Sequence, residues 1–147
     1  MDFDACSTKH KKPLIPVEES GRKFTIQNPQ KALVVEVKVD GCLINDHRER
    51  CDYLFEIGQK CHCVVYLELK GADIEKAYNQ LIATIGYTTE KYKNSRKICH
   101  IVASRVPKSG PKIQNLKVSM AKKYKVLLKV DTDRTSINIT STHYCET

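Results

Sequence analysis

Two alternating apolar runs joined by a short polar break constrain the fold of this 147-residue chain more than any other feature. They make up the segment CDYLFEIGQKCHCVVYLELKG, residues 51–71, and Gly58-Gln59-Lys60 forms the break. Side chains two apart in a strand lie on one face, so each run predicts a strand with two distinct faces. A turn centred near Lys60 would pair the two strands in antiparallel fashion, with residue 52 opposite residue 68.

The predicted pairing brings two carboxylates together. Asp52 shares a strand face with Leu54 and Glu56. Glu68 shares its face with Lys70, two residues further on. Directly opposed residues have Cβ atoms roughly 4.5–5.5 Å apart, and two carboxylates that close repel each other unless a cation lies between them. The pattern therefore predicts a cation site, or else a half-exposed hairpin whose charges form salt bridges.

A helix and a further strand are predicted directly after the hairpin. In GADIEKAYNQLIATIG, residues 71–86, apolar residues recur at i, i+3, i+4, i+7, i+8 and i+11, which is one face of a helix. Asp73 is placed to cap the start of this helix and Gly86 to end it. The run KICHIVASRV, residues 97–106, is rich in β-branched residues and predicts a buried strand.

The rest of the chain predicts four more strands and one more helix around this unit. The strands are expected at residues 23–27, 31–41, 125–130 and 136–140, and the helix at residues 110–125. Residues 1–21 mix polar and charged residues with two prolines, so we expect a flexible or irregular N-terminal arm, followed by a single domain over residues 22–147. The element order predicts an α/β (α+β) protein with a mixed central β-sheet flanked by helices.

Charge is the most informative part of the composition. The chain carries 25 Lys and Arg against 17 Asp and Glu, and residues 91–125 contain eleven Lys or Arg and no acidic residue. Such a basic tract predicts a polyanionic partner, nucleic acid above all, although a solvated basic face would also produce it. Arg105, Lys108 and Lys112 lie at a predicted strand end, where we expect them to bind phosphates.

Segments that would direct the chain to a membrane are not expected. No apolar run approaches the roughly eighteen residues of a membrane span, and the first residues lack the apolar region of a signal peptide. Seven cysteines form an odd count without the spacing of a disulfide framework, which favours a reducing compartment and mostly buried or idle thiols. We therefore expect a soluble cytoplasmic protein that does not bind membranes.

Asp52 on one strand, Glu68-Leu69-Lys70 on the next, the following helix and strand 98–104 together resemble the PD-(D/E)XK nuclease-like superfamily. The resemblance implies a restriction-endonuclease-like core, of the kind found in restriction endonucleases and archaeal Holliday-junction resolvases. It also implies that Asp52, Glu68 and the backbone carbonyl of Leu69 hold Mg²⁺ or Mn²⁺, and that Lys70 orients the attacking water. A homodimer is a further implication, because members of the superfamily are often dimers.

The chemistry of phosphodiester hydrolysis requires the same residue types, independently of the resemblance. Hard oxygen ligands hold divalent cations that stabilise charge on phosphoryl oxygens and activate water, and a lysine adds a fixed positive charge. Gln80 on the following helix and Glu56 on the first strand are supplementary candidates. A second Glu-x-Lys, at Glu36–Lys38, lacks an equally placed aspartate.

Three functions remain open from the sequence. The first is a metal-dependent nuclease acting on DNA in preference to RNA, and the second is a non-catalytic nucleic-acid-binding module on the same fold. The third is a small protein-binding regulator that docks an acidic partner on its basic face. A zinc site at Cys61–Cys63 with Cys99-His100 lacks the usual ligand spacing. A cysteine nucleophile aided by His100 is disfavoured because Cys99 and His100 point to opposite faces of their strand.

Overall fold

The computed structural model describes residues 1–106, 111–141 and 143–144, apart from the side chain of Lys70. Within these residues the chain forms two helices, α1 (Ile74–Thr88) and α2 (Pro111–Tyr124). Over the same residues it forms nine strands: β1 (Ser7–His10), β2 (Leu14–Glu19), β3 (Arg22–Gln27), β4 (Val34–Lys38), β5 (Tyr53–Ile57), β6 (Cys63–Gly71), β7 (Arg96–Ala103), β8 (Leu127–Thr132) and β9 (Arg134–Asn138).

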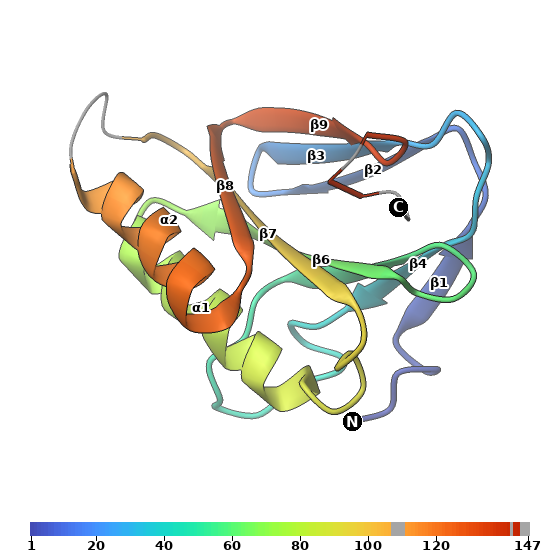
Figure 1. The fold of residues 1–147 in the computed structure, drawn as a ribbon, viewed down its shortest axis with the longest axis horizontal. Coiled ribbons are helices and arrows are strands. Elements are labelled where there is room, and N and C mark those ends of the chain that lie inside the picture. Colours follow the sequence, from blue (N-terminus) through green and yellow to red (C-terminus); the bar gives the residue numbers. More distant parts are fainter. Residues whose placement is uncertain (107–110, 142, 145–147) are drawn as a thin grey trace.

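The strands form two mixed sheets that lie one above the other. The larger sheet has the order β1-β4-β5-β6-β7-β8; its pairs are antiparallel from β1 to β6 and parallel from β6 to β8. The smaller sheet has the order β2-β3-β9, in which β3 and β9 run parallel. Figure 1 shows the smaller sheet on one side of the larger sheet and both helices on the other, which gives three layers.

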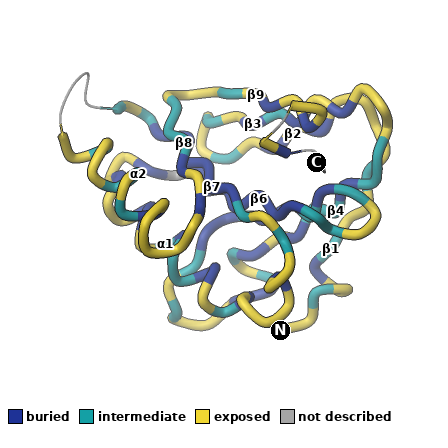
Figure 2. The backbone as a smooth tube through the Cα atoms, viewed as in Figure 1, coloured by how far each residue is buried: buried dark blue, intermediate teal, exposed yellow. Residues whose placement is uncertain are grey.

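Side chains that alternate along β5 and β6 fill the two cores on either side of the larger sheet. Leu54 and Tyr66 pack with the helices, whereas Phe55, Val65 and Leu67 pack against the smaller sheet. Figure 2 shows that buried residues line this middle layer. Because both faces of these strands are covered, their apolar runs are nearly continuous.

The expected fold class, a mixed α+β protein built on a mixed sheet, is confirmed, but the layers differ from the expectation. The helices cover only one face of the larger sheet, and the other face is covered by the smaller sheet. Strands β3 and β9, which were expected to belong to one central sheet, pair with each other instead. Phe24 and Ile137 on these strands contribute to the core between the two sheets, which explains their burial.

The expectation of a flexible or irregular arm over residues 1–21 is wrong, because this segment contains β1 and β2. Strand β2 alternates between exposed and buried residues, and Ile15 and Val17 are buried against the larger sheet. Pro16 is compatible with this strand because β2 lies at the edge of its sheet, where one side of the backbone needs no ladder partner. A left-handed turn at Ser20-Gly21 then leads directly into β3.

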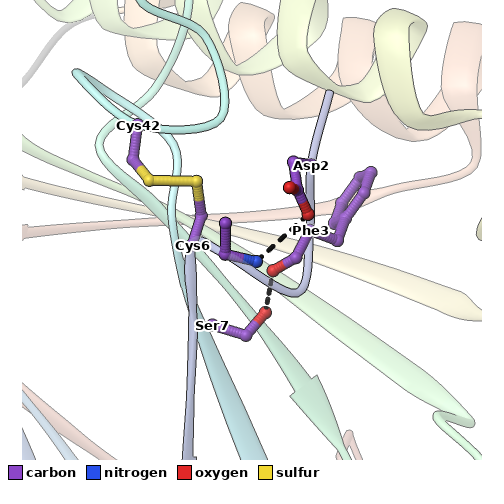
Figure 3. The surroundings of a disulfide bond; sticks show 6 residues. Asp2, Phe3, Cys6, Ser7 and Cys42 are labelled. Carbon is purple, nitrogen blue, oxygen red and sulfur yellow. Dashed lines mark hydrogen bonds between the residues drawn. A yellow bond between two sulfur atoms is a disulfide. The ribbon is translucent and has the colours of Figure 1, made fainter.

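A disulfide bond between Cys6 and Cys42 fastens the N-terminal segment to the turn that follows β4 (Figure 3). Beside it, the Lys38 amide donates a hydrogen bond of 3.0 Å to the Cys6 carbonyl. The expectation that the thiols stay idle is therefore wrong for these two cysteines. Among the described residues, the remaining cysteines are free: Cys51, Cys61, Cys63 and Cys99.

Helix α1 begins as expected but ends two residues later than Gly86. The Asp73 side chain accepts a hydrogen bond from the Lys76 amide, which caps the first turn. At the other end the Thr88 hydroxyl is held by the hydroxyl of Tyr66 on β6 at 2.7 Å, so packing carries the helix past Gly86. Neither helix in the described part of the chain is long and apolar enough to cross a membrane.

Candidate active site

The hairpin register brings the two predicted carboxylates together. Strands β5 and β6 pair from Tyr53 opposite Leu67 to Ile57 opposite Cys63, and Asp52 lies immediately before the first of these pairs. The Asp52 amide donates a hydrogen bond of 3.1 Å to the Leu67 carbonyl, which fixes its position at the end of the hairpin. Both carboxyl side chains belong to buried residues, with exposed fractions of 2% for Asp52 and 3% for Glu68.

The Asp52 carboxylate is anchored to the backbone of the neighbouring strand. Its Oδ2 accepts a hydrogen bond of 2.8 Å from the Leu69 amide, while the Leu69 side chain is buried in the core between the two sheets. The carboxylate therefore lies next to the residue whose carbonyl oxygen is the predicted third metal ligand. This contact also orients one carboxylate before any ligand binds.

Strand β6 has a bulge at the Glu-x-Lys motif. Glu68 pairs with Ile101 but Gly71 pairs with Ala103, so the register with β7 shifts between these positions. Such bulges re-aim side chains and are common next to active sites. The expectation that Glu68 and Lys70 share a face assumes an unbroken alternation, which the bulge interrupts; the Lys70 side chain lies outside the described part.

Asp52 and Glu68 line an open cavity of about 260 Å³ that helix α1 borders. Gln80 and Lys76, one helical turn apart on α1, line the same cavity. Gln80, predicted as a supplementary residue, thus lies at this cavity, and its role stays a prediction. The structure thus gathers two carboxylates, an amide and an ammonium group around one space.

Thr84 connects this helix to the segment directly before β5 that carries Asp52. Its buried hydroxyl accepts a hydrogen bond of 2.9 Å from the Cys51 amide and donates one of 2.9 Å to the Gln80 carbonyl. One threonine therefore holds the backbone next to Asp52 and the backbone of Gln80 together. The sequence pattern placed Thr84 on the helix without indicating this role.

The loop before β5 supplies the remaining wall of the cavity, which the sequence analysis missed. His47, Arg48, Glu49 and Arg50 line the cavity together with Asp40 from the turn after β4. A signal was present, since basic and acidic residues alternate through DHRER immediately before Cys51-Asp52. Alternating charges are common in solvent-exposed loops, so the pattern alone did not identify a site.

Two arginines of this loop are held by carboxylates. The Arg50 Nε donates a hydrogen bond of 2.9 Å to Asp40, and the Arg48 Nε donates to both carboxylate oxygens of Asp46 at 3.0 Å. The hydrogen bonds from Arg48 lower the pKa of the Asp46 carboxyl, and in return they raise the pKa of the Arg48 guanidinium. Ion pairs thus hold both arginine side chains of the loop.

Other predicted residues lie away from this cavity. Glu56 accepts a hydrogen bond of 2.6 Å from the Tyr92 hydroxyl and lines a different cavity near the hairpin turn. Arg105 is exposed after β7, and Lys112 on α2 forms an ion pair of 3.1 Å with Glu75. Neither of these basic residues lines the cavity of Asp52, and Lys108 lies outside the described residues.

The rival zinc and cysteine sites are not assembled. Cys99 packs on the helix side of the larger sheet, whereas Cys63 and His100 face the smaller sheet. Burial raises the pKa of the Cys63 thiol to about 12, which opposes the thiolate form needed for a ligand or nucleophile. Across the described residues, no group of three or more His, Cys, Asp or Glu side chains is arranged to hold a metal ion.

No protein-family model, curated protein or solved structure matches this chain. A functional conclusion therefore depends on the residues of the cavity and on their geometry.

Proposed function

We propose that this protein is a metal-dependent nuclease that hydrolyses phosphodiester bonds, with DNA as its substrate in preference to RNA. The main support is that two buried carboxylates, Asp52 directly before β5 and Glu68 on β6, line one open cavity. Oxygen ligands in such an arrangement suit a hard divalent cation, and a cation offsets the repulsion between the carboxylates.

Asp52 and Glu68 would hold Mg²⁺ or Mn²⁺ together with the backbone carbonyl of Leu69. A bound divalent cation supplies Lewis acidity toward the phosphoryl oxygens and lowers the pKa of a coordinated water. Lys70 is assigned to orienting that water. Gln80 borders the cavity from α1 and would donate or accept a hydrogen bond at the reacting group.

The order of elements around the cavity also supports this proposal. Strands β5 and β6, helix α1 and strand β7 follow one another as in the restriction-endonuclease-like core that the motif resembles. Helix α1 packs on β6 and β7, as Figure 1 shows, and so lies over the strand that carries Glu68 and over its neighbour. We therefore assign residues of this unit to the catalytic core.

A non-catalytic nucleic-acid-binding module is the second candidate, and the surface of α2 favours it. Three lysines on or directly after this helix are exposed at one end, Lys122, Lys123 and Lys125, and they belong to the acid-free tract. A surface of this kind binds phosphates irrespective of chemistry at Asp52. A binding module would retain affinity for nucleic acid but would not cleave it.

A cleavage assay separates the two candidates. Labelled single-stranded, duplex and branched DNA and RNA substrates are incubated with Mg²⁺ or Mn²⁺, and with EDTA as the metal-free condition. The nuclease should cleave only with metal, and Asp52→Asn should abolish cleavage, whereas Asp133→Asn in the turn between β8 and β9 should not. Lys70→Ala should remove most cleavage with little loss of affinity, because one charge is a small part of the electrostatic binding energy. Binding without cleavage under every metal condition would select the second candidate.

A further inference from the structure

Arg48 is held in a fixed orientation at the wall of the cavity. Its Nε donates to both carboxylate oxygens of Asp46 at 3.0 Å, and its Cζ lies 5.0 Å from the centre of the Tyr87 ring on α1. The carboxylate thus fixes one edge of the guanidinium, and the aromatic ring supports its face. Within the described residues the two terminal nitrogens, Nη1 and Nη2, donate no hydrogen bond.

The neighbouring Arg50 has a different environment from Arg48. The Arg50 Nε donates a hydrogen bond of 2.9 Å to Asp40. Its Nη1 donates to the Arg48 carbonyl at 2.8 Å and also to the Asp46 carbonyl. Its guanidinium therefore ties the loop together from inside. The Arg48 side chain is 40% exposed, against 25% for Arg50, and its terminal nitrogens are the ones available to a ligand.

We propose that Arg48 binds a backbone phosphate of the nucleic-acid strand, beside the phosphate that Asp52 and Glu68 address. A guanidinium held at Nε presents its terminal nitrogens as a planar fork, which matches two oxygens of a phosphate. Because its orientation is set by Asp46 and Tyr87, little side-chain freedom is lost when the phosphate binds. The proposal builds on the proposed function and moves the expected phosphate contact to the cavity wall, away from Arg105 and Lys112.

The charges around the cavity favour a polymeric ligand over a free anion. The lining carries four carboxylates, those of Asp40, Glu49, Asp52 and Glu68, against three fixed cations, Arg48, Arg50 and Lys76, so a small anion that enters alone meets a net negative charge. A nucleic-acid strand carries many phosphates, so contacts elsewhere on the basic surface compensate for this repulsion. Inorganic phosphate should therefore compete poorly with a strand for Arg48.

The test is a binding titration in EDTA, which prevents metal-dependent cleavage. Fluorescence anisotropy of a labelled duplex and of a labelled single strand is measured over a salt series for wild type, Arg48→Gln and Arg48→Lys. Arg134→Gln is the matched control, since Arg134 is an exposed arginine on β9 in the smaller sheet. A circular-dichroism melt of each variant verifies that it is folded.

Loss of one phosphate contact should flatten the slope of log affinity against log salt by about 0.9 on duplex DNA for Arg48→Gln. Arg48→Lys should keep most of the slope and yet bind more weakly than wild type, because an ammonium lacks the fork. Tyr87→Leu removes the support without changing charge and should also weaken binding. The control should behave as wild type, and inorganic phosphate should not displace the strand at matched ionic strength.

Equal slopes and affinities for wild type and folded Arg48→Gln would overturn the assignment. An equal loss in Arg134→Gln would overturn it too, since the effect would then reflect net charge alone. Displacement by inorganic phosphate would refute the polymeric ligand. The proposed function can fail independently of this site. If binding depends on Arg48 but no metal-dependent cleavage occurs, Arg48 is a phosphate site of a binding module and the nuclease proposal fails. If cleavage occurs but Arg48→Gln does not affect binding, the nuclease proposal stands and the Arg48 site is refuted.

Discussion

The disulfide between Cys6 and Cys42 should contribute a large part of the stability of this chain. The two cysteines are 36 residues apart, and in the chain-entropy model closing a loop of that size contributes about 4 kcal/mol at 25 °C. Strand β1 begins directly after Cys6, has only four residues and forms an edge of the larger sheet. Its residues are exposed or half-buried, so little apolar burial holds it without the covalent link.

Reduction of this bond should lower the melting temperature by roughly 8–15 °C, since about 1 kcal/mol corresponds to 2–4 °C in a chain of this size. The measurement is differential scanning calorimetry with and without a phosphine reductant, with mass spectrometry to establish that the bond is open. The Cys6→Ser/Cys42→Ser variant should melt at the lower temperature in both conditions, which shows that no other thiol responds. An unchanged melting temperature after verified reduction would refute the reasoning that the bond limits the unfolded chain.

Three further perturbations test the site and the core. Mg²⁺ at one hundred times its dissociation constant should stabilise the wild type by about 2.7 kcal/mol. This stabilisation should appear as a rise in melting temperature, and Asp52→Asn should abolish the rise. Thr84→Val leaves the Cys51 amide unpaired, so it should lower the free energy of unfolding in urea by about 1–3 kcal/mol and weaken the stabilisation by Mg²⁺. Thr88→Val should also lower the free energy of unfolding but keep the stabilisation by Mg²⁺. Burial lowers the pKa of His100 to about 3. Between about pH 6.5 and pH 3 this imidazole therefore binds a proton in the unfolded state but not in the folded state. The free energy of unfolding should fall by about 1.4 kcal/mol per pH unit as the pH drops through this range. Urea melts at two pH values should show this slope in wild type and a smaller one in His100→Gln.

The hairpin was predictable because its register has a strong local determinant. A slip of one residue between β5 and β6 would turn Leu54 and Phe55 to the wrong faces, and both are fully buried in different cores. Because the turn around Lys60 is short, only one pairing register places the apolar residues of both strands on their buried faces. The structure has the predicted register from Tyr53 opposite Leu67 to Ile57 opposite Cys63, and Asp52 lies just before this ladder.

The division into two sheets was not predictable from the same kind of pattern. Alternation in β3 and β9 indicates that Phe24 and Ile137 are buried but says nothing about which strand lies alongside. Their parallel pairing joins segments more than one hundred residues apart in sequence, so it depends on the packing of the whole chain. Strand β2 escaped prediction for a local reason, because Pro16 interrupts a short alternating pattern that only an edge position tolerates.

The hydrogen bonds at the end of the hairpin opposite its turn do not follow from the periodicity of the sequence. Here two backbone amides donate to side chains: Cys51 to the Thr84 hydroxyl and Leu69 to the Asp52 carboxylate. The Leu69 amide lies within the bulge of β6 between Glu68 and Gly71, so a side chain takes up a backbone donor there. Sequence alternation predicted that Asp52 and Glu68 lie near each other, but the orientation of the Asp52 carboxylate follows from its hydrogen bond with the Leu69 amide.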